Sequence, residues 1–124
     1  MIRELRPDDL EKLKFIHEKY YKEEFNFPDF SRHFLCAYVV ERNGKIITAG
    51  GIRTIIECIA ITDKDLSVRE RRDGLGYILN ASRYFTKRND YNELHCFVQD
   101  NNWMKHLLDS GFTTTAGISL VTEV

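Results

Sequence analysis

The stretch from Cys36 to Ile52, CAYVVERNGKIITAGGI, constrains the fold more than any other part of the chain. Two apolar segments flank Asn43-Gly44, a pair that readily adopts the positive φ angles of a two-residue hairpin turn. The sequence therefore predicts two antiparallel strands joined at this turn. A third strand, Ile56–Thr62, is apolar on both faces, which favours a place in the middle of a sheet covered on both sides.

Helical spacing before the hairpin predicts a first helix that begins near Pro7 and Asp8. Glu11 stands three residues after Asp8, as a capping box requires. A second short helix is expected from Asp29. The apolar face of the first helix comprises Leu10, Leu13, Ile16 and Tyr20.

The second half of the chain predicts an alternation of helices and strands. A helix running to about Arg88 buries an apolar face, and a last helix ends at Gly111, a residue that easily takes the left-handed cap conformation. The closing segment, TTTAGISLVTEV, is expected to form one strand, or two short ones around Gly117. The apolar face of the longer helix comprises Leu75, Ile78, Leu79 and Phe85, and the outer strands are IREL, Ile2–Leu5, and ELHCFV, Glu93–Val98.

This order predicts an α+β fold in one domain, residues 1–124. An antiparallel meander followed by a β-α-β crossover gives a mixed, mostly antiparallel central sheet with helices on both faces. The length of 124 residues suits a single core.

Charge and composition narrow the function. Eighteen basic residues nearly balance nineteen acidic ones, so no net field favours a nucleic-acid or membrane partner. The N-terminus has no apolar segment typical of a signal peptide, and we expect a cytoplasmic location. The three cysteines are isolated and lie in apolar stretches, so we expect reduced side chains and no metal cluster: Cys36, Cys58 and Cys96.

The stretch RERRDGLGYIL, Arg69–Leu79, predicts an anion site at a helix start. The first backbone N–H groups of a helix lack partners, and the helix dipole favours negative charge. Gly74 and Gly76 would let the backbone approach a pyrophosphate, and Arg71 or Arg72 could pair with its oxygens. The alternative is a solvated helix start with two incidental glycines.

The register of this helix decides between the two interpretations. A helix that begins at about Asp73 presents Gly74 and Gly76 to a ligand, whereas a helix capped by Ser67 places them in its second and third turns. We expect the start at Asp73.

These motifs resemble the GNAT N-acetyltransferase superfamily. Arg71-Arg72-Asp73-Gly74-Leu75-Gly76 is similar to that family's cofactor loop, (Gln/Arg)-x-x-Gly-x-(Gly/Ala), which follows its fourth strand. The N-terminal IRELRPDDL looks like the family's first strand and helix start. The segment VQDNNWMKHLLDSGF is similar to its late segment, in which an asparagine opens a helix that ends in Gly-Phe. The resemblance spans nearly the whole chain.

The resemblance implies transfer of an acetyl group from acetyl-CoA, a co-substrate, to a primary amine of a small molecule or protein. It implies that backbone groups of Ile59 to Ile61 pair with the pantetheine arm and that Asn101 supports the cofactor. It also implies direct attack of the amine on the thioester. For the oligomeric state the sequence leaves a monomer or a homodimer open, the latter through an exposed sheet edge near the C-terminus.

Glu57 is the candidate general base. It interrupts the apolar strand Ile55–Ile61, where desolvation makes a carboxylate a stronger base. The resemblance adds that some members use a glutamate of this strand to deprotonate the amine. A strand-end carboxylate paired with Arg53 is the structural alternative.

Departures from the family pattern keep a second function open. The link Asp63–Glu70 is longer than usual, and Leu107 and Leu108 stand where many members carry a tyrosine general acid. A catalytically inactive GNAT-fold binding module is the alternative. His95 and Cys96 do not make a nucleophile pair, because adjacent strand residues point to opposite faces.

Overall fold

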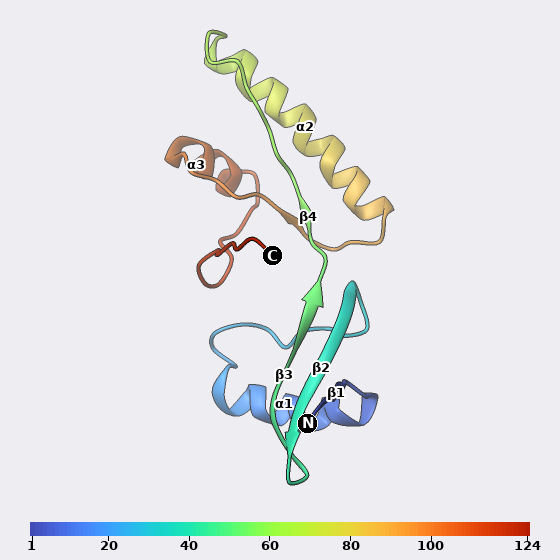
Figure 1. The fold of residues 1–124 in the computed structure, drawn as a ribbon. Helices are drawn as coiled ribbons and strands as arrows, with labels where there is room; N and C mark the ends of the chain where they lie inside the picture. The colour runs from blue at the N-terminus through green and yellow to red at the C-terminus, as the bar shows by residue number, and fades with distance from the viewer. The chain divides into compact units, whose positions relative to one another are not determined.

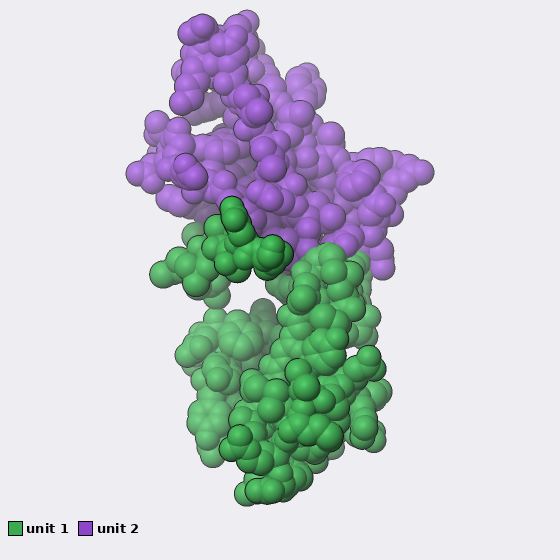
Figure 2. All heavy atoms as spheres, in the orientation of Figure 1, with its two compact units in different colours: residues 1–54, 111–124 green, residues 55–110 purple.

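The computed structural model describes residues 1–124, whose backbone contacts divide into two compact units. The first comprises residues 1–54 and 111–124, and the second comprises residues 55–110; Figure 2 colours them green and purple. Each unit is described by itself. The elements, labelled in Figure 1, are β1 (Ile2–Glu4), the 3-10 helix η1 (Pro7–Asp9), α1 (Leu10–Tyr20), β2 (Phe34–Arg42), β3 (Lys45–Arg53), β4 (Ile56–Glu57), α2 (Val68–Arg88), β5 (Leu94–His95) and α3 (Asn101–Asp109).

The first unit is built on the predicted hairpin, which is confirmed. Asn43 and Gly44 have φ angles of 52° and 73°, so both turn residues are left-handed, as a tight hairpin turn between twisted strands requires. β2 and β3 pair antiparallel on either side of this turn, and β1 pairs antiparallel with β2, in the order β1-β2-β3. Val39, in the central strand β2, is fully buried.

A close backbone approach fixes one position of this sheet. Gly51 on β3 lies opposite Ala37 on β2, and a Cβ at Gly51 would overlap the carbonyl oxygen of Cys36. The position therefore requires glycine for space and not for its φ angle.

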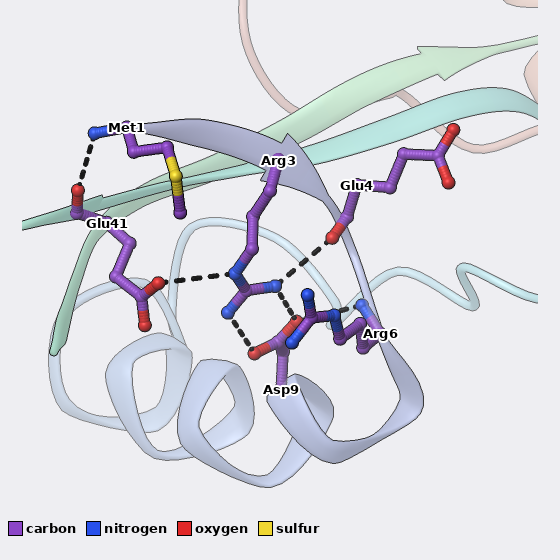
Figure 3. Close-up of polar contacts among 6 residues, drawn as sticks. All are labelled: Met1, Arg3, Glu4, Arg6, Asp9 and Glu41. Atoms are coloured by element: carbon purple, nitrogen blue, oxygen red, sulfur yellow. Dashed lines mark hydrogen bonds and ion pairs between the residues drawn. The ribbon is translucent and has the colours of Figure 1, made fainter.

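An ion-pair network joins β1 to the helical start and to β2 (Figure 3). The Arg3 guanidinium donates to both carboxylate oxygens of Asp9 at 2.8 Å, and its Nε donates to Glu41 at 3.3 Å. Asp9 also accepts from the Arg6 backbone N–H at 2.8 Å and is 5% exposed. These bonds hold the pKa of the Asp9 carboxyl well below its usual range, with Arg3 as the largest cause.

The helix start differs from the prediction in one respect, the identity of the acid that accepts a hydrogen bond from the N–H of the cap residue. Asp9, and not Glu11, accepts the N–H of the cap residue Arg6, because the chain first forms the short 3-10 turn Pro7–Asp9. On α1, Leu13 is buried as predicted, whereas Tyr20 is exposed.

The second unit contains a parallel pair, β4 and β5, with the helices α2 and α3. Ile56 pairs with Leu94 and Glu57 with His95. The α+β class, with antiparallel and parallel pairing, is thus confirmed, and the pairings lie in two sheets. Leu79 of α2 and Leu107 of α3 are buried.

Three predicted elements are wrong. No helix begins at Asp29, which instead accepts the Ser31 backbone N–H in a local turn. The strand predicted over Ile56–Thr62 ends at Glu57, and it has a neighbour on one edge only, so it is not central. Residues 113–124 form no strand, because no other strand pairs with them and a strand without a partner is unstable.

None of the helices is long and apolar enough to cross a lipid bilayer.

Candidate functional site

All residues predicted for cofactor binding and catalysis lie in the second unit, residues 55–110. They fall on three of its elements or on the segment that follows β4. Glu57 ends β4, the arginines and glycines lie on α2, and Asn101 is the first residue of α3.

The parallel pair is short, and its two strands separate after Cys58. The Cys58 N–H donates to the His95 carbonyl at 2.8 Å, and this is the last hydrogen bond between the two segments. The next four residues, 59–62, have no backbone hydrogen bonds, and the Ile61 side chain is 99% exposed. Extended backbone with unpaired N–H and C=O groups is a surface on which another extended group with amides can pair.

The α2 helix starts at Val68, so the expected start at Asp73 is wrong. Ser67 caps it: its hydroxyl accepts the Glu70 N–H at 3.1 Å, and the Glu70 carboxylate accepts the Ser67 N–H at 3.2 Å. This reciprocal capping box satisfies first-turn donors and fixes the helix start ahead of the glycines.

Gly74 and Gly76 therefore lie inside the helix. Their N–H groups belong to the helical i to i−4 pattern and are not free for an anion. Positions two apart on a helix differ by about 200° around the axis, so the two glycines face opposite sides. A Cβ at either one would meet no atom within 4 Å, which leaves the helix surface open at both places.

The arginines of α2 remain available to an anion. Arg71 is half-buried, and its Nε is a buried donor without a hydrogen-bond partner, whereas Arg72 is exposed. A buried donor without a partner is unfavourable, so an anion that reached Arg71 would gain a charge-assisted hydrogen bond.

Glu57 is exposed, so the expected burial of its carboxylate is wrong. The cause is the size of the sheet, since two short strands cover little of either face. Within its unit, Glu57 has no hydrogen-bond or ion-pair partner, and the carboxylate is free to accept a cation or a proton. The alternative pairing with Arg53 stays a prediction, because Arg53 belongs to the other unit.

An open cavity of about 470 Å³ lies between α2 and the parallel strands. Its walls are mostly apolar, and Thr86 and Ser82 bring hydroxyls that already have partners. Two side chains predicted for the core of α2, Ile78 and Phe85, line this cavity and are exposed. Its full lining is Ile55, Ile56, Glu57, Ile78, Ala81, Ser82, Phe85, Thr86 and Leu94.

Cys58 and Cys96 are neighbours in the second unit, which the sequence did not indicate. Burial, with a smaller contribution from the Cys58 side chain, raises the pKa of the Cys96 thiol to about 11. Cys96 is therefore a neutral thiol near pH 7 and a poor nucleophile, in agreement with the prediction.

His95, which the sequence excludes as half of a nucleophile pair with Cys96, becomes a functional candidate through its surroundings in the structure. Its side chain is 15% exposed, its Nε2 lies 3.7 Å from a Glu93 carboxylate oxygen, and its buried Nδ1 has no hydrogen-bond partner. Glu57 lies beside it in the strand register. The sequence alone could not show that His95 lies beside Glu57, because this depends on the pairing register of two strands that are far apart in sequence.

The last helix is capped by Asp100, whose carboxylate accepts the Asn102 N–H at 2.8 Å. Asn101 is exposed at the first helical position, and its predicted cofactor role stays a prediction. Gly111 has a φ of 97°, which confirms it as the left-handed residue after the helix.

The fold and these residues define an α+β protein with a parallel strand pair and two helices around its candidate site. No protein-family model matches the chain, and no curated protein matches it significantly. Among solved structures the chain is similar to the aminoglycoside N-acetyltransferase AAC(6')-Iy in complex with CoA, at 13% identity and a TM-score of 0.36, over 100% of this chain and 99% of that one. This TM-score is too low to define a shared fold, so the function is proposed from the residues of this chain.

Proposed function

We propose that this protein transfers an acetyl group from acetyl-CoA to a primary amine. The observation that carries the proposal is the unpaired extended backbone after Cys58, in the same unit as Arg71 and Glu57. The motif resemblance to GNAT N-acetyltransferases supports acetyl transfer as the reaction type. The proposal also includes a single domain, residues 1–124, and a cytoplasmic location. The three free cysteines agree with a reducing compartment.

Each group has a role that its chemistry allows. The backbone amides and carbonyls of Ile59 to Ile61 bind the two amides of the pantetheine arm. Arg71 and Arg72 pair with the pyrophosphate, and Asn101 supports the cofactor from the start of α3. The positions of Gly74 and Gly76 allow close approach to the helix surface, because neither carries a side chain.

Glu57 accepts the proton of the acceptor ammonium, so that the neutral amine attacks the thioester carbon. The new N–C bond forms, the C–S bond breaks, and the thiolate of CoA takes a proton from the nitrogen. The proton that Glu57 took is then released to water, so the products are the amide, the CoA thiol and one proton. No tyrosine stands on α3 for the thiolate, and Leu107, at 2% exposed, is part of the packing of its unit.

Calorimetry with acetyl-CoA tests the cofactor site. We expect wild type to bind, and Arg71→Ala to weaken binding roughly 10- to 100-fold, as for a lost hydrogen bond to a charged group. Gly74→Glu places a negative charge beside the proposed phosphate position and should weaken binding, and so should Gly76→Glu if that face of the helix is the one used. Asn80→Glu adds the same charge to an exposed position further along α2 and serves as the matched control.

Two outcomes contradict the proposal. If wild type does not bind acetyl-CoA at millimolar concentration, the proposed acetyl-CoA-dependent activity is excluded. If Arg71→Ala, Gly74→Glu and Gly76→Glu all bind acetyl-CoA as strongly as wild type does, the cofactor does not bind at this location.

The second candidate is a binding module without catalysis. It is favoured by the start of α2 at Val68, because the Ser67–Glu70 capping box satisfies donors that would otherwise contact a phosphate. Acetyl-CoA binding without acetyl transfer to any member of a primary-amine panel would support this candidate over the enzyme.

A further inference from the structure

The face of the parallel pair that carries Glu57 also carries a histidine with an unused ring nitrogen. Residues in register on neighbouring strands project to the same face, so Glu57 and His95 lie side by side. Ile56 and Leu94 project to the other face and line the cavity against α2, and Glu57, at the end of β4, also forms part of that lining. Cys58 projects to that same face and its Sγ lies 3.5 Å from the Ser82 hydroxyl of α2. The Glu57–His95 face is therefore the polar face of this pair.

The two ring nitrogens of His95 have different surroundings. Nε2 lies 3.7 Å from the Glu93 carboxylate, too far for a direct hydrogen bond, and the nearby negative charge favours a proton on Nε2. Nδ1 is buried and has no partner. In the tautomer that Glu93 favours, Nδ1 keeps its lone pair and can accept a proton.

A buried acceptor without a partner is unusual in a folded protein, where most buried polar atoms are hydrogen-bonded. Imidazoles held by a carboxylate on one nitrogen and open on the other serve as proton acceptors in many enzymes. Glu57 is the residue paired with His95 across the two strands, on the same face of the pair.

We propose that His95 accepts the proton that Glu57 takes from the acceptor ammonium. The Glu57 carboxyl gives its proton to Nδ1 and regains its charge, so it can hold the next ammonium, while the second proton of the nitrogen goes to the CoA thiolate. The resulting imidazolium carries its positive charge beside the Glu93 carboxylate, which is mostly exposed to solvent. The proton leaves to water when the product leaves. His95 is thus a positioning and relay residue that acts through Glu57, and this inference rests on the proposed acetyl transfer.

Kinetics of acetyl transfer to the best amine of the panel test the relay. His95→Gln should lower kcat about 100-fold, the lower end of the range for acid–base groups, with the KM for acetyl-CoA unchanged. Added imidazole should restore part of the kcat of His95→Ala. Imidazole should not restore the activity of Glu57→Gln. His17→Gln replaces a histidine of the other unit and should keep the wild-type kcat.

A second measurement does not depend on activity and separates this inference from the proposed function. The ¹⁵N and ¹H spectrum of the His95 ring in wild type should show the proton on Nε2 and none on Nδ1, and Glu93→Gln should reduce this preference. A proton on Nδ1 in wild type overturns the relay even if the enzyme is active. An active His95→Gln with unchanged kcat also overturns it, whereas a wild type that binds acetyl-CoA but acetylates no amine overturns the proposed reaction and the relay with it.

Discussion

At the scale of single residues, the carboxylate of Asp9 determines how the N-terminal region responds to pH. Arg3 and the Arg6 N–H hold its pKa below the usual value of about 3.9. An acid with a lowered folded-state pKa contributes stability above its unfolded pKa, and that contribution is lost as the pH falls below about 4.

We therefore expect the midpoint of urea unfolding to fall between pH 5 and pH 3 in wild type. Asp9→Asn should destabilise the protein at pH 7, since Arg3 loses its charged partner, and should flatten this pH dependence. Asp8→Asn is the control, because Asp8 is exposed and next to Asp9 in sequence. An Asp9→Asn variant with wild-type pH dependence would contradict the role of the network.

Two neighbouring glycines of β3 give a second residue-scale test. Gly51→Ala puts a Cβ 2.8 Å from the Ala37 Cα and against the Cys36 carbonyl, so we expect a loss of about 1–3 kcal/mol in the free energy of unfolding. A Cβ at Gly50 meets no atom within 4 Å, and Gly50→Ala should be neutral or stabilising by about 0.5–1 kcal/mol. Equal losses for both variants, measured by chemical denaturation, would show that the β2–β3 register differs from the one described.

At the scale of elements, the glycines of α2 report on where the helix begins. In a helix from Val68 to Arg88, Gly74→Ala and Gly76→Ala should each raise the stability by about 1 kcal/mol, because alanine has a higher helix propensity and its Cβ meets nothing. Ser67→Ala should lower it by about 1 kcal/mol through loss of the cap.

Far-ultraviolet circular dichroism during thermal unfolding measures all three variants. If the alanines are destabilising and Ser67→Ala is neutral, the helix begins near Asp73 and the glycines lie in its first turn. Alanine variants that are more stable and yet bind acetyl-CoA more weakly would show that the glycines are kept for the ligand and not for the helix.

The elements also show what a sequence can predict. The hairpin at Asn43-Gly44 was predictable because its signal is local: two residues with positive φ between two apolar strands. The capping pair Ser67 and Glu70 was equally local. The motif resemblance outweighed it in favour of Asp73, and the local physical signal was correct.

Pairing between distant segments was less predictable. The apolar stretch after Ile56 indicated a central strand, but strand length depends on a partner, and β5 pairs only as far as His95. The candidate site likewise depends on pairing between distant segments. Glu57 and Arg71 carry chemistry that is visible in the sequence, whereas the proximity of Glu57 to His95 depends on a register that no local pattern encodes.

At the scale of the whole molecule, net charge and exposed apolar surface together determine how readily molecules of this protein associate. The chain has 18 basic and 19 acidic residues and an isoelectric point near 6.4, so repulsion between molecules is weakest close to neutral pH. Several large apolar side chains are exposed, among them Leu120 and Val121 near the C-terminus. Contacts between such side chains are opposed by little charge at this pH.

We therefore expect light scattering at fixed protein concentration to be greatest near pH 6.4 and to fall toward pH 5 and pH 9. Leu120→Glu removes an exposed apolar side chain and adds one negative charge, so it should lower the scattering at pH 6.4 and move its maximum to a lower pH. Thr122→Glu adds the same charge nearby without removing apolar surface, and should move the maximum while lowering its height less. Two variants with equal heights would show that the Leu120 side chain does not drive association, since only the added charge would then matter. Scattering that does not change with pH would show that net charge does not control association.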